Sequence, residues 1–276
     1  MSPDEPHYLL GHTESELRRL DIQGDLYRDI TRGAFERAGI EAGMRVLDIG
    51  CGTGDVSLVA ARLVGPDGYV LGIDRGEGAL AVARAKALAA DMPWAEFERH
   101  EVADFERTSS FDALVGRFVL MHQSDAAAVL AKAARSVRPG GVVVMIESYM
   151  ELLRTGGHSH PHSPLYDRIV RFKSEVVSGA GADLHAGGRL RSTFGAAGLP
   201  SPECRLETRL EGGAASPYYA YVAESIRSML PEAARTDVRG FTAADVPGLE
   251  DRLRSEVTAI DGVLVVWPAV IATVRL

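Results

Sequence analysis

The stretch Val46-Leu47-Asp48-Ile49-Gly50-Cys51-Gly52-Thr53-Gly54 decides the fold, because it joins a short apolar strand to a glycine-rich turn. Residues 45–49 form an apolar run closed by glycine, the pattern of a buried parallel strand. A helix is predicted to start at Asp55 or Val56. Glycine lets the backbone turn sharply and lets a ligand lie against bare main chain. The helix start adds N–H groups and a partial positive charge, so the turn suits a carboxylate or a phosphate.

The spacing of the glycines separates this turn from two other nucleotide-binding loops. A dinucleotide-binding GxGxxG motif would place its third glycine at position 55, where this chain has Asp55. A phosphate-binding P-loop would need a lysine directly after its last glycine, and none follows here. Asp74 closes the next predicted strand, where a carboxylate can accept hydrogen bonds from both hydroxyls of a ribose. Asp55 at the helix start would also repel a pyrophosphate, and Asp74 together with the glycine turn is strong evidence for a ligand that contains a ribose.

Strands and helices alternate along the first half of the chain. The predicted strands are 45–49, 69–73, 95–102, 111–115 and 142–146, and the helices between them are 56–64, 78–91 and 124–137. Arg138-Pro139-Gly140-Gly141 is typical of a turn before the last of these strands. This alternation predicts right-handed βαβ crossovers and a parallel sheet that is covered on both faces.

The two ends of the chain are less regular. At the N-terminus, a capping box at 13–16 predicts a helix that breaks at Gly24, followed by a second helix over 25–38. Further helices are predicted at 164–177, 190–197, 218–230 and 248–260, and a strand at 203–210. The final strand is expected to start after Pro268, because proline cannot donate to a strand ladder, with 263–267 as an extended approach segment.

Composition excludes several classes of function. The chain has 276 residues and a net charge of −8, a poor match for the phosphate neutralisation on which nucleic-acid binding depends. Its two cysteines, Cys51 and Cys204, cannot build a disulfide framework or a cysteine-based zinc site, and they fit a reducing cytoplasm. No apolar run approaches the roughly 20 residues that span a bilayer. The opening MSPDEPHYLL has no basic region, so no secretory signal is expected.

The spacing Asp-x-Gly-x-Gly-x-Gly from Asp48 to Gly54, followed by Asp74, resembles motif I of class I S-adenosylmethionine-dependent methyltransferases. The opening, from Tyr8 to Gln23, is similar to that of bacterial small-molecule methyltransferases of the ubiquinone and menaquinone biosynthesis type. The resemblance implies a Rossmann-like α/β fold with a doubly wound, mostly parallel seven-stranded sheet whose last strand is antiparallel. It also implies S-adenosyl-L-methionine as cofactor and S-adenosyl-L-homocysteine as product.

The resemblance assigns roles to individual residues. Asp104 would take the adenine amino group with Phe105 beside the ring, and the segment from Gly116 would line the methionine part of the cofactor. Gln23 would reach the methionine carboxylate. The residues expected at the cofactor are Tyr8, Gln23, Asp48, Gly50, Cys51, Gly52, Gly54, Asp74, Arg75, Ala103, Asp104, Phe105, Gly116, Arg117 and Phe118.

Methyl transfer from a sulfonium needs a general base only if the acceptor must lose a proton. Three residues are candidates for that base: His122 past the fourth strand, Glu147 at the end of the fifth, and His12 near the N-terminus. A helix cap or a salt bridge is the alternative role for each of them. The alternate histidines at 158, 160 and 162 lack the helical spacing of HExxH, so no metal site is expected and the loop is predicted to be a flap over the acceptor pocket.

These features predict an enzyme that methylates an O, N or C atom of a small molecule, in bacterial secondary metabolism. No convincing linker is present, so one domain is expected, with a helical lid at 1–39, a cofactor-binding core at 40–150 and acceptor-side insertions at 151–276. We expect a cytoplasmic monomer or homodimer with no nucleic-acid or membrane partner. The alternatives are a protein or tRNA methyltransferase, and a protein that keeps the cofactor pocket without transferring methyl groups.

Overall fold

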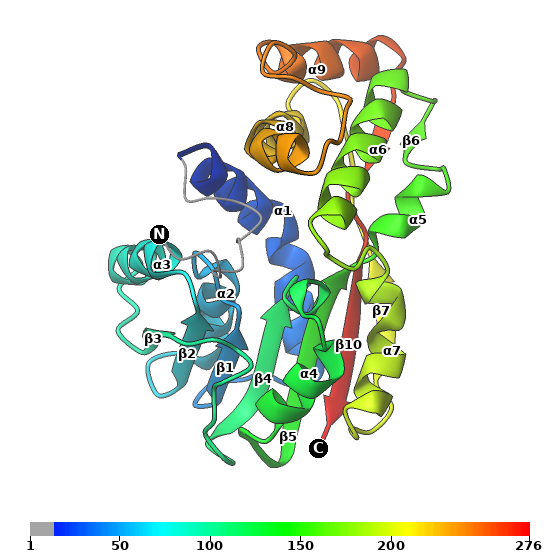
Figure 1. Cartoon of the computed structure of the whole chain (residues 1–276). Coiled ribbons are helices and arrows are strands. Elements are labelled where there is room, and N and C mark those ends of the chain that lie inside the picture. The colour runs from blue at the N-terminus through cyan, green and yellow to red at the C-terminus, as the bar shows by residue number, and fades with distance from the viewer. Residues whose placement is uncertain (1–13) are drawn as a thin grey trace. The chain divides into compact units, whose positions relative to one another are not determined.

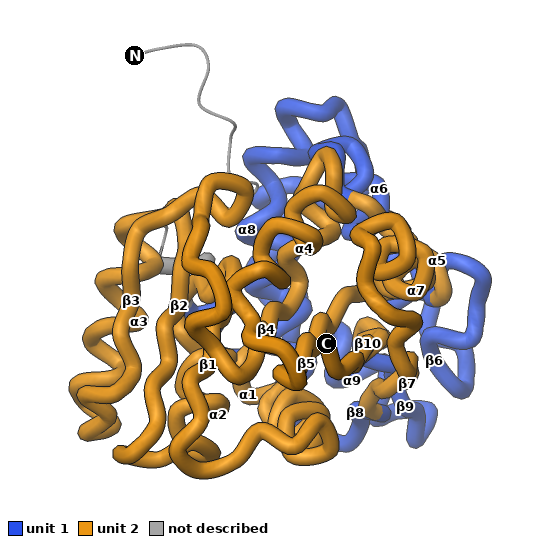
Figure 2. The backbone as a smooth tube through the Cα atoms, turned by 90° about the horizontal axis from the view of Figure 1, so that it is seen from below, with its two compact units in different colours: residues 1–23, 153–182, 210–266 blue, residues 24–152, 183–209, 267–276 orange. Residues whose placement is uncertain are grey.

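A computed structural model describes residues 14–276 (Figure 1). By their contacts, the described residues divide into two compact units, which Figure 2 distinguishes by colour. The sheet unit holds Gly24–Leu152, Asp183–Arg209 and Trp267–Leu276. The helical unit holds residues 14–23, Leu153–Ala182 and Leu210–Val266. That the whole chain forms a single domain stays a prediction.

The sheet unit is built on seven strands in the order β3-β2-β1-β4-β5-β10-β7. Strand β10 runs antiparallel to both of its neighbours, and the pairs from β3 to β5 are parallel. This confirms the predicted seven-stranded, mostly parallel Rossmann-like sheet. The strands are β1 (Arg45–Ile49), β2 (Tyr69–Asp74), β3 (Ala95–Arg99), β4 (Phe111–Arg117), β5 (Val137–Ser148), β7 (Glu203–Glu207) and β10 (Ala269–Arg275).

Helices cover both faces of this sheet, as alternation of side chains along β1 shows. Leu47 and Ile49 belong to a buried core that includes side chains of α4 (Ala126–Ala134) and α7 (Ala186–Ala196). Asp48, between them in sequence, points to the opposite face, where it bonds to Ser57 of α2 (Asp55–Val64). The remaining helices of the unit are α3 (Glu77–Ala89), the short 3-10 helix η1 (Leu120–His122) and most of α1 (Glu14–Ala38).

The helical unit combines the start of α1 with α6 (Pro164–Gly179), α8 (Tyr218–Arg235) and α9 (Leu249–Ala259). It also holds a small antiparallel sheet of β6 (Ser159–His160), β9 (Val263–Val265) and β8 (Leu210–Gly212), in the order β6-β9-β8. The short helix α5 (Met150–Arg154) lies at the boundary between the two units in sequence. Among the described helices, none is long and apolar enough to cross a membrane.

The predicted helix break at Gly24 is wrong, because α1 is continuous from Glu14 to Ala38. A glycine inside a helix costs only about 1 kcal/mol relative to alanine, which packing can offset. Here a β-carbon on Gly24 would lie 2.7 Å from Cγ of Asp55, so the missing side chain lets α1 pass close to α2.

Several strand boundaries also differ from the prediction. The predicted strand 203–210 is divided between β7 and β8, which belong to different sheets. Residues 263–265 of the predicted approach segment form strand β9, whose partners β6 and β8 are distant in sequence. Strand β5 already starts at Val137, and the predicted turn is an irregularity inside it, where the register shifts relative to β4. Gly141 fits there because a β-carbon would lie 2.6 Å from the carbonyl oxygen of Asp112.

Candidate functional site

The glycine turn after β1 has the geometry that its sequence predicts. Gly50, Gly52 and Gly54 have φ values of 63°, 52° and 83°, in the left-handed region that favours glycine. A β-carbon on Gly50 would lie 2.5 Å from Cγ2 of Val119, and one on Gly54 would lie 2.9 Å from Cβ of Ala83. A β-carbon on Gly52 would meet no atom within 4 Å. The outer glycines are therefore required by packing, whereas Gly52 leaves bare backbone beside open space.

Asp74, the last residue of β2, is tied to this turn. Its Oδ2 accepts a hydrogen bond from the N–H of Gly52 at 3.0 Å, and its Oδ1 accepts one from the N–H of Gly76 at 2.8 Å. The Cys51 N–H donates to the carbonyl of Ile73 at 3.0 Å, which joins the turn to the end of β2. Each carboxylate oxygen has a second lone pair, so Asp74 can still accept from a ligand hydroxyl.

Asp48 is fully buried behind the turn. Its Oδ2 accepts from the hydroxyl of Ser57 at 2.5 Å, while its Oδ1 has no hydrogen-bond partner among the described residues. Burial raises the pKa of Asp48 to about 7, against the lowering effects of the Ser57 hydrogen bond and the positive Arg117. A buried acceptor without a partner is uncommon in proteins and points to a ligand or a water at this place.

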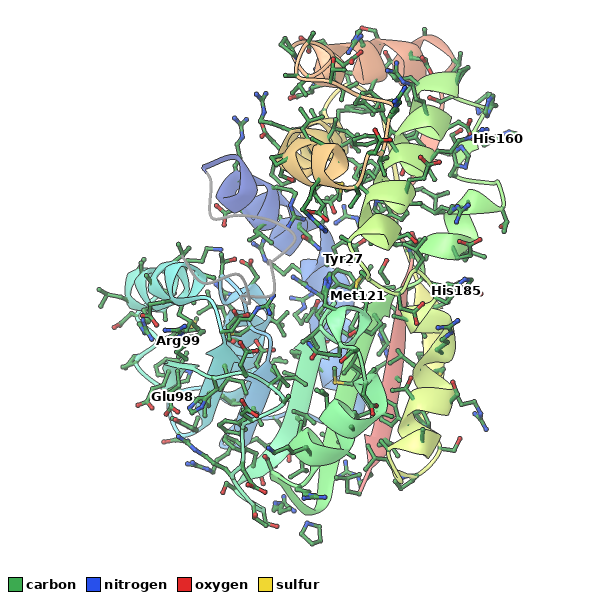
Figure 3. The ribbon with its side chains drawn as sticks, in the orientation of Figure 1. Tyr27, Glu98, Arg99, Met121, His160 and His185 are labelled. Carbon is green, nitrogen blue, oxygen red and sulfur yellow. The ribbon has the colours of Figure 1, made fainter. Side chains whose placement is uncertain are left out.

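The end of β4 contributes an aromatic and cationic cluster. Phe118 has a left-handed φ of 59°, and its ring centroid lies 5.0 Å from that of Tyr27 in an edge-to-face contact. The Arg117 guanidinium lies 5.7 Å from both ring centroids and donates to Thr31 Oγ1 at 2.9 Å. Figure 3 labels Tyr27, which comes from α1. The sequence interpretation missed Tyr27 and Thr31, since neither stands out from its helical pattern.

The segment after β3 leaves the sheet beside Asp74, because the N–H of His100 donates to the Asp74 carbonyl at 3.0 Å. Phe105 is buried, with its ring centroid 5.2 Å from that of His100, and Ala103 and Asp104 are exposed. Arg75 is half-buried and its carbonyl accepts from Nε of Arg99 at 3.1 Å. The structure thus brings four predicted cofactor segments of the sheet unit to one edge: 48–54, 74–75, 103–105 and 116–118.

The three candidate bases differ in their surroundings. Glu147 is fully buried, and its carboxylate accepts from the N–H groups of Val119, Leu120 and Met121 at 3.0, 2.7 and 3.4 Å. His122 is exposed at the end of η1. His12 lies outside the described residues, as does the predicted cofactor residue Tyr8.

Two predicted features fall in the helical unit. Gln23 is half-buried and accepts from Arg19 at 2.6 Å. In the loop with the three histidines, His158 is buried, and its Nδ1 lies 3.1 Å from the carbonyl of Leu153. The next residues pair as β6, and His160 is labelled in Figure 3. Among the described residues, no group of three or more His, Cys, Asp or Glu side chains is placed to hold a metal ion.

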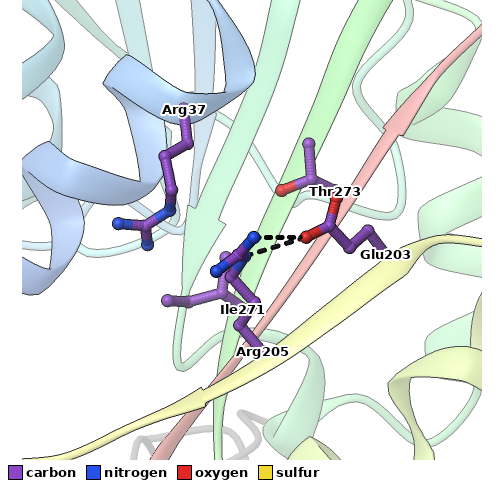
Figure 4. A pocket seen from close by; sticks show the side chains of 5 residues that line it. All are labelled: Arg37, Glu203, Arg205, Ile271 and Thr273. Atoms are coloured by element: carbon purple, nitrogen blue, oxygen red, sulfur yellow. Dashed lines mark hydrogen bonds and ion pairs between the residues drawn. The ribbon is translucent and has the colours of Figure 1, made fainter.

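A pocket of about 230 Å³ in the sheet unit lies away from these residues. It is lined by Arg37, Glu203, Arg205, Ile271 and Thr273, as Figure 4 shows. Nε of Arg205 donates to Glu203 at 2.8 Å, and Arg37 pairs with Glu207. Both arginines thus have carboxylate partners, and none of the predicted site residues lines the pocket.

Comparisons with known proteins agree with this architecture. The model of a methyltransferase-domain family matches residues 40–180. A demethylmenaquinone methyltransferase from Lactococcus lactis is 35% identical over 146 residues, which is 52% of this chain and 52% of the relative. One from Oceanobacillus iheyensis is 32% identical over 118 residues, 42% of this chain and 50% of the relative. The chain thus matches only about half the length of these curated relatives.

Solved structures share the fold at low sequence identity. The YcgJ protein of a Bacillus species has a TM-score of 0.56 at 16% identity, covering 90% of this chain and 98% of its own. The [4+2]-cyclase SpnF has a TM-score of 0.52 at 20% identity, covering 90% and 80%. These likenesses show the fold alone, since one fold supports more than one chemistry. The family match shows that the chain belongs to the methyltransferase-domain family, as its sequence predicts.

Proposed function

We propose that this protein transfers a methyl group from S-adenosylmethionine to an O, N or C atom of a small molecule. The observation that carries the proposal is the pairing of Asp74 with the N–H of Gly52, beside backbone that is open on its outer side. A carboxylate fixed next to bare main chain can bind ribose hydroxyls while the rest of the ligand lies along the turn.

The residues present fit the cofactor. Asp74 would accept from the ribose, and the left-handed backbone at Gly52 leaves room for the ligand chain. The unpaired Oδ1 of Asp48 adds a buried acceptor behind the turn. Phe105 and Asp104, on the segment beside Asp74, would contact the adenine. When bound, S-adenosylmethionine supplies an electrophilic methyl group on a sulfonium centre.

The contribution of the chain is chiefly to hold the reactants. Holding a nucleophile and a methyl group in line can supply a large part of the rate acceleration without covalent chemistry by the protein. Val119 packs on Gly50, and Asp74 accepts a hydrogen bond from the Gly52 N–H, so the start and the middle of the turn are both held in place. His122 is exposed and is the last residue of η1, which begins just after Val119. Among the described residues, we assign it as the base for an acceptor that must lose a proton.

The chemistry of the chain supports a small acceptor. Its net charge of −8 disfavours binding to RNA. The relatives that match part of this chain are named demethylmenaquinone methyltransferases. We therefore propose a small-molecule acceptor in secondary metabolism, a cytoplasmic location and a monomer or homodimer. Methylation of a tRNA or a protein, or cofactor binding without transfer, are the outcomes that would replace this proposal.

Calorimetry with S-adenosylmethionine, S-adenosylhomocysteine, NAD and ATP tests the cofactor. We expect the first two to bind and the last two not to bind. Asp74→Ala should weaken binding about ten- to hundredfold, because it removes hydrogen bonds to a charged acceptor. Asp67→Ala, in the exposed turn before β2, is the matched control and should leave affinity unchanged.

Transfer is tested separately with methyl-labelled cofactor and panels of small phenols, amines, quinols, tRNA and protein. Label that enters a small molecule supports the proposal. Label that enters only tRNA or protein would instead show a macromolecular acceptor. Tight cofactor binding with no transfer to any compound of the panels would show a protein that binds the cofactor without methylating.

A further inference from the structure

Glu147 lies near the end of β5, and its carboxylate meets a turn that belongs to another part of the sheet. Its Oε1 accepts from the N–H groups of Val119 at 3.0 Å and Leu120 at 2.7 Å, and its Oε2 lies 3.4 Å from the N–H of Met121. Val119 is the N-cap residue of η1, and Leu120 and Met121 are its first two residues, just after β4. One buried side chain therefore satisfies the backbone donors of the whole turn.

The turn held in this way packs on the cofactor loop. Cγ2 of Val119 would be 2.5 Å from a β-carbon on Gly50, so its methyl group occupies the space that only glycine leaves. Cγ1 of Val119 would likewise be 3.1 Å from a β-carbon on Gly116. On the other side, the Met121 carbonyl accepts from the N–H of Asp183 at 2.9 Å. Any movement of the turn would thus be transmitted to Gly50.

The chemistry of the contact requires a carboxylate. Three N–H donors converge on two oxygens, and a glutamine would offer one acceptor oxygen and turn its NH₂ toward another donor. Burial raises the pKa of Glu147 to about 7, while the three N–H groups act to lower it. A carboxylate whose oxygens already accept from three N–H groups, and which has no exposed surface, is poorly placed to take a proton from the methyl acceptor.

We propose that Glu147 is a positioning residue that holds the Val119–Met121 turn against Gly50, and that it thereby shapes the cofactor loop rather than acting as the base. This rests on the proposed function in one respect, namely that the loop around Gly50 holds the cofactor. Because Val119 packs on Gly50, loss of the carboxylate is expected to weaken cofactor binding and to leave the pH dependence of kcat unchanged.

Hydrogen exchange of the unliganded protein tests the first step without any activity. In Glu147→Ala the amides of Val119, Leu120 and Met121 should exchange at least tenfold faster than in the wild type. In Glu147→Gln, which keeps the side-chain volume, the Leu120 amide should stay protected while that of Met121 loses protection. Unchanged exchange in both variants overturns the proposal. Should Glu147→Ala not fold, the contrast between the Leu120 and Met121 amides in Glu147→Gln decides alone.

Cofactor affinity and rate separate positioning from base catalysis. Glu147→Gln should weaken S-adenosylhomocysteine binding about fivefold or more, the effect of one or two lost hydrogen bonds, and keep the acid limb of the kcat profile. Val119→Ala should weaken binding similarly while exchange at Leu120 stays slow. Glu203→Gln, on β7 at the edge of the sheet, is the control and should change neither the affinity for S-adenosylhomocysteine nor the exchange of the Leu120 amide.

An opposite pattern overturns the proposal: unchanged affinity in Glu147→Gln, with kcat lowered about 10²- to 10⁴-fold and the acid limb lost, would make Glu147 the base. Wild-type protein that binds no S-adenosylhomocysteine would refute the proposed function instead. The exchange measurement would in that case still decide whether Glu147 holds the turn.

Discussion

Gly24 of α1 lies against the carboxylate of Asp55 at the start of α2: a β-carbon on Gly24 would be 2.7 Å from Cγ and 2.9 Å from Oδ1 of Asp55. Asp55 is itself held in place, because Lys86 Nζ donates to its Oδ1 at 3.0 Å and Thr53 Oγ1 donates to its Oδ2 at 3.0 Å. At Gly24, α1 therefore presents only its backbone to the start of α2, with no side chain between the two helices. An aspartate can occupy the place of the third glycine of a dinucleotide motif because α1 carries a glycine opposite it.

Gly24→Ala should lower the free energy of unfolding by up to about 2 kcal/mol. Alanine normally gains about 1 kcal/mol over glycine in a helix, but overpacking against fixed atoms costs about 1–3 kcal/mol. Gly33→Ala in the same helix is the control and should be neutral or stabilising, since its β-carbon would meet only the far end of the Arg37 side chain. Urea denaturation of both variants measures the difference. Equal gains in both would show that Asp55 moves away freely, and Gly24→Ala combined with Asp55→Ala should recover the loss.

Asp48 should make the protein less stable as pH rises from about 4 to about 7. Burial raises its pKa from about 3.8 to about 7 in the folded protein, so the native state binds the proton that the unfolded chain has released. Stability therefore falls with pH across this window, by up to about 1.4 kcal/mol per pH unit for one group. In Asp48→Asn this contribution is absent, and the gap between the variant and the wild type should widen in favour of the variant from pH 5 to pH 7.

The measurement is the free energy of unfolding of Asp48→Asn and wild type at several pH values. Asp112→Asn is the control: burial acts to raise the pKa of Asp112, but the Arg45 N–H and Arg138 hold it below its usual value, outside this range. Its curve should run parallel to that of the wild type between pH 5 and 8. A parallel curve for Asp48→Asn would instead mean that Asp48 stays ionised throughout.

Lys173 of α6 should limit the stability of the helical unit. It is fully buried, with Nζ 4.8 Å from the ring centroid of Tyr221, and burial, together with the positive charge of Arg19, holds its pKa well below the usual value. Lys173→Met should raise the free energy of unfolding at pH 7 by about 1–3 kcal/mol, as apolar replacements of buried charges often do. The gain should shrink as pH rises, because the unfolded chain then also loses the proton.

Thermal or urea unfolding at pH 6.5 and 9 measures this gain, with Lys132→Met on the partly exposed face of α4 as the control, expected near zero. A clear loss of stability in Lys173→Met would show that the ammonium makes an interaction worth more than the cost of burying it.

The sequence predicts what is local and fails where distant segments meet. The course from β1 through Gly50, Gly52 and Gly54 to α2 is encoded within ten consecutive residues, so the turn, its left-handed backbone and the neighbouring Asp74 could all be predicted. The place of Gly24 inside a continuous helix could not be predicted, because the close approach of Asp55 that explains the glycine comes from a distant part of the sequence.

The same reason explains the missed strands and the role of Glu147. Strands β8 and β9 have three residues each, too short for an alternation signal, and they exist through pairing with each other and with β6. Glu147 was a candidate base from its place at a strand end, yet its three donors come from the connection after β4. Residue type and edge position predict that a carboxylate is near the site, but only tertiary structure shows which donors it meets.

His122 is the exposed candidate base, and its replacement should separate proton transfer from positioning. It lies at the end of η1, directly after the turn that Glu147 holds, and imidazole takes up protons near neutral pH. If it accepts the proton of the acceptor, His122→Ala should lower kcat about 10²- to 10⁴-fold, remove the acid limb of the rate profile and leave cofactor affinity unchanged.

His185→Ala is the control, an exposed histidine at the start of α7 (Figure 3), and should keep normal kinetics. A higher KM for the acceptor, with kcat and the pH profile unchanged, would show that His122 contributes to acceptor binding and not to proton transfer. Since Glu147 is enclosed by its three donors, normal kcat and KM in His122→Ala would leave alignment of the reactants as the main source of catalysis among the described residues.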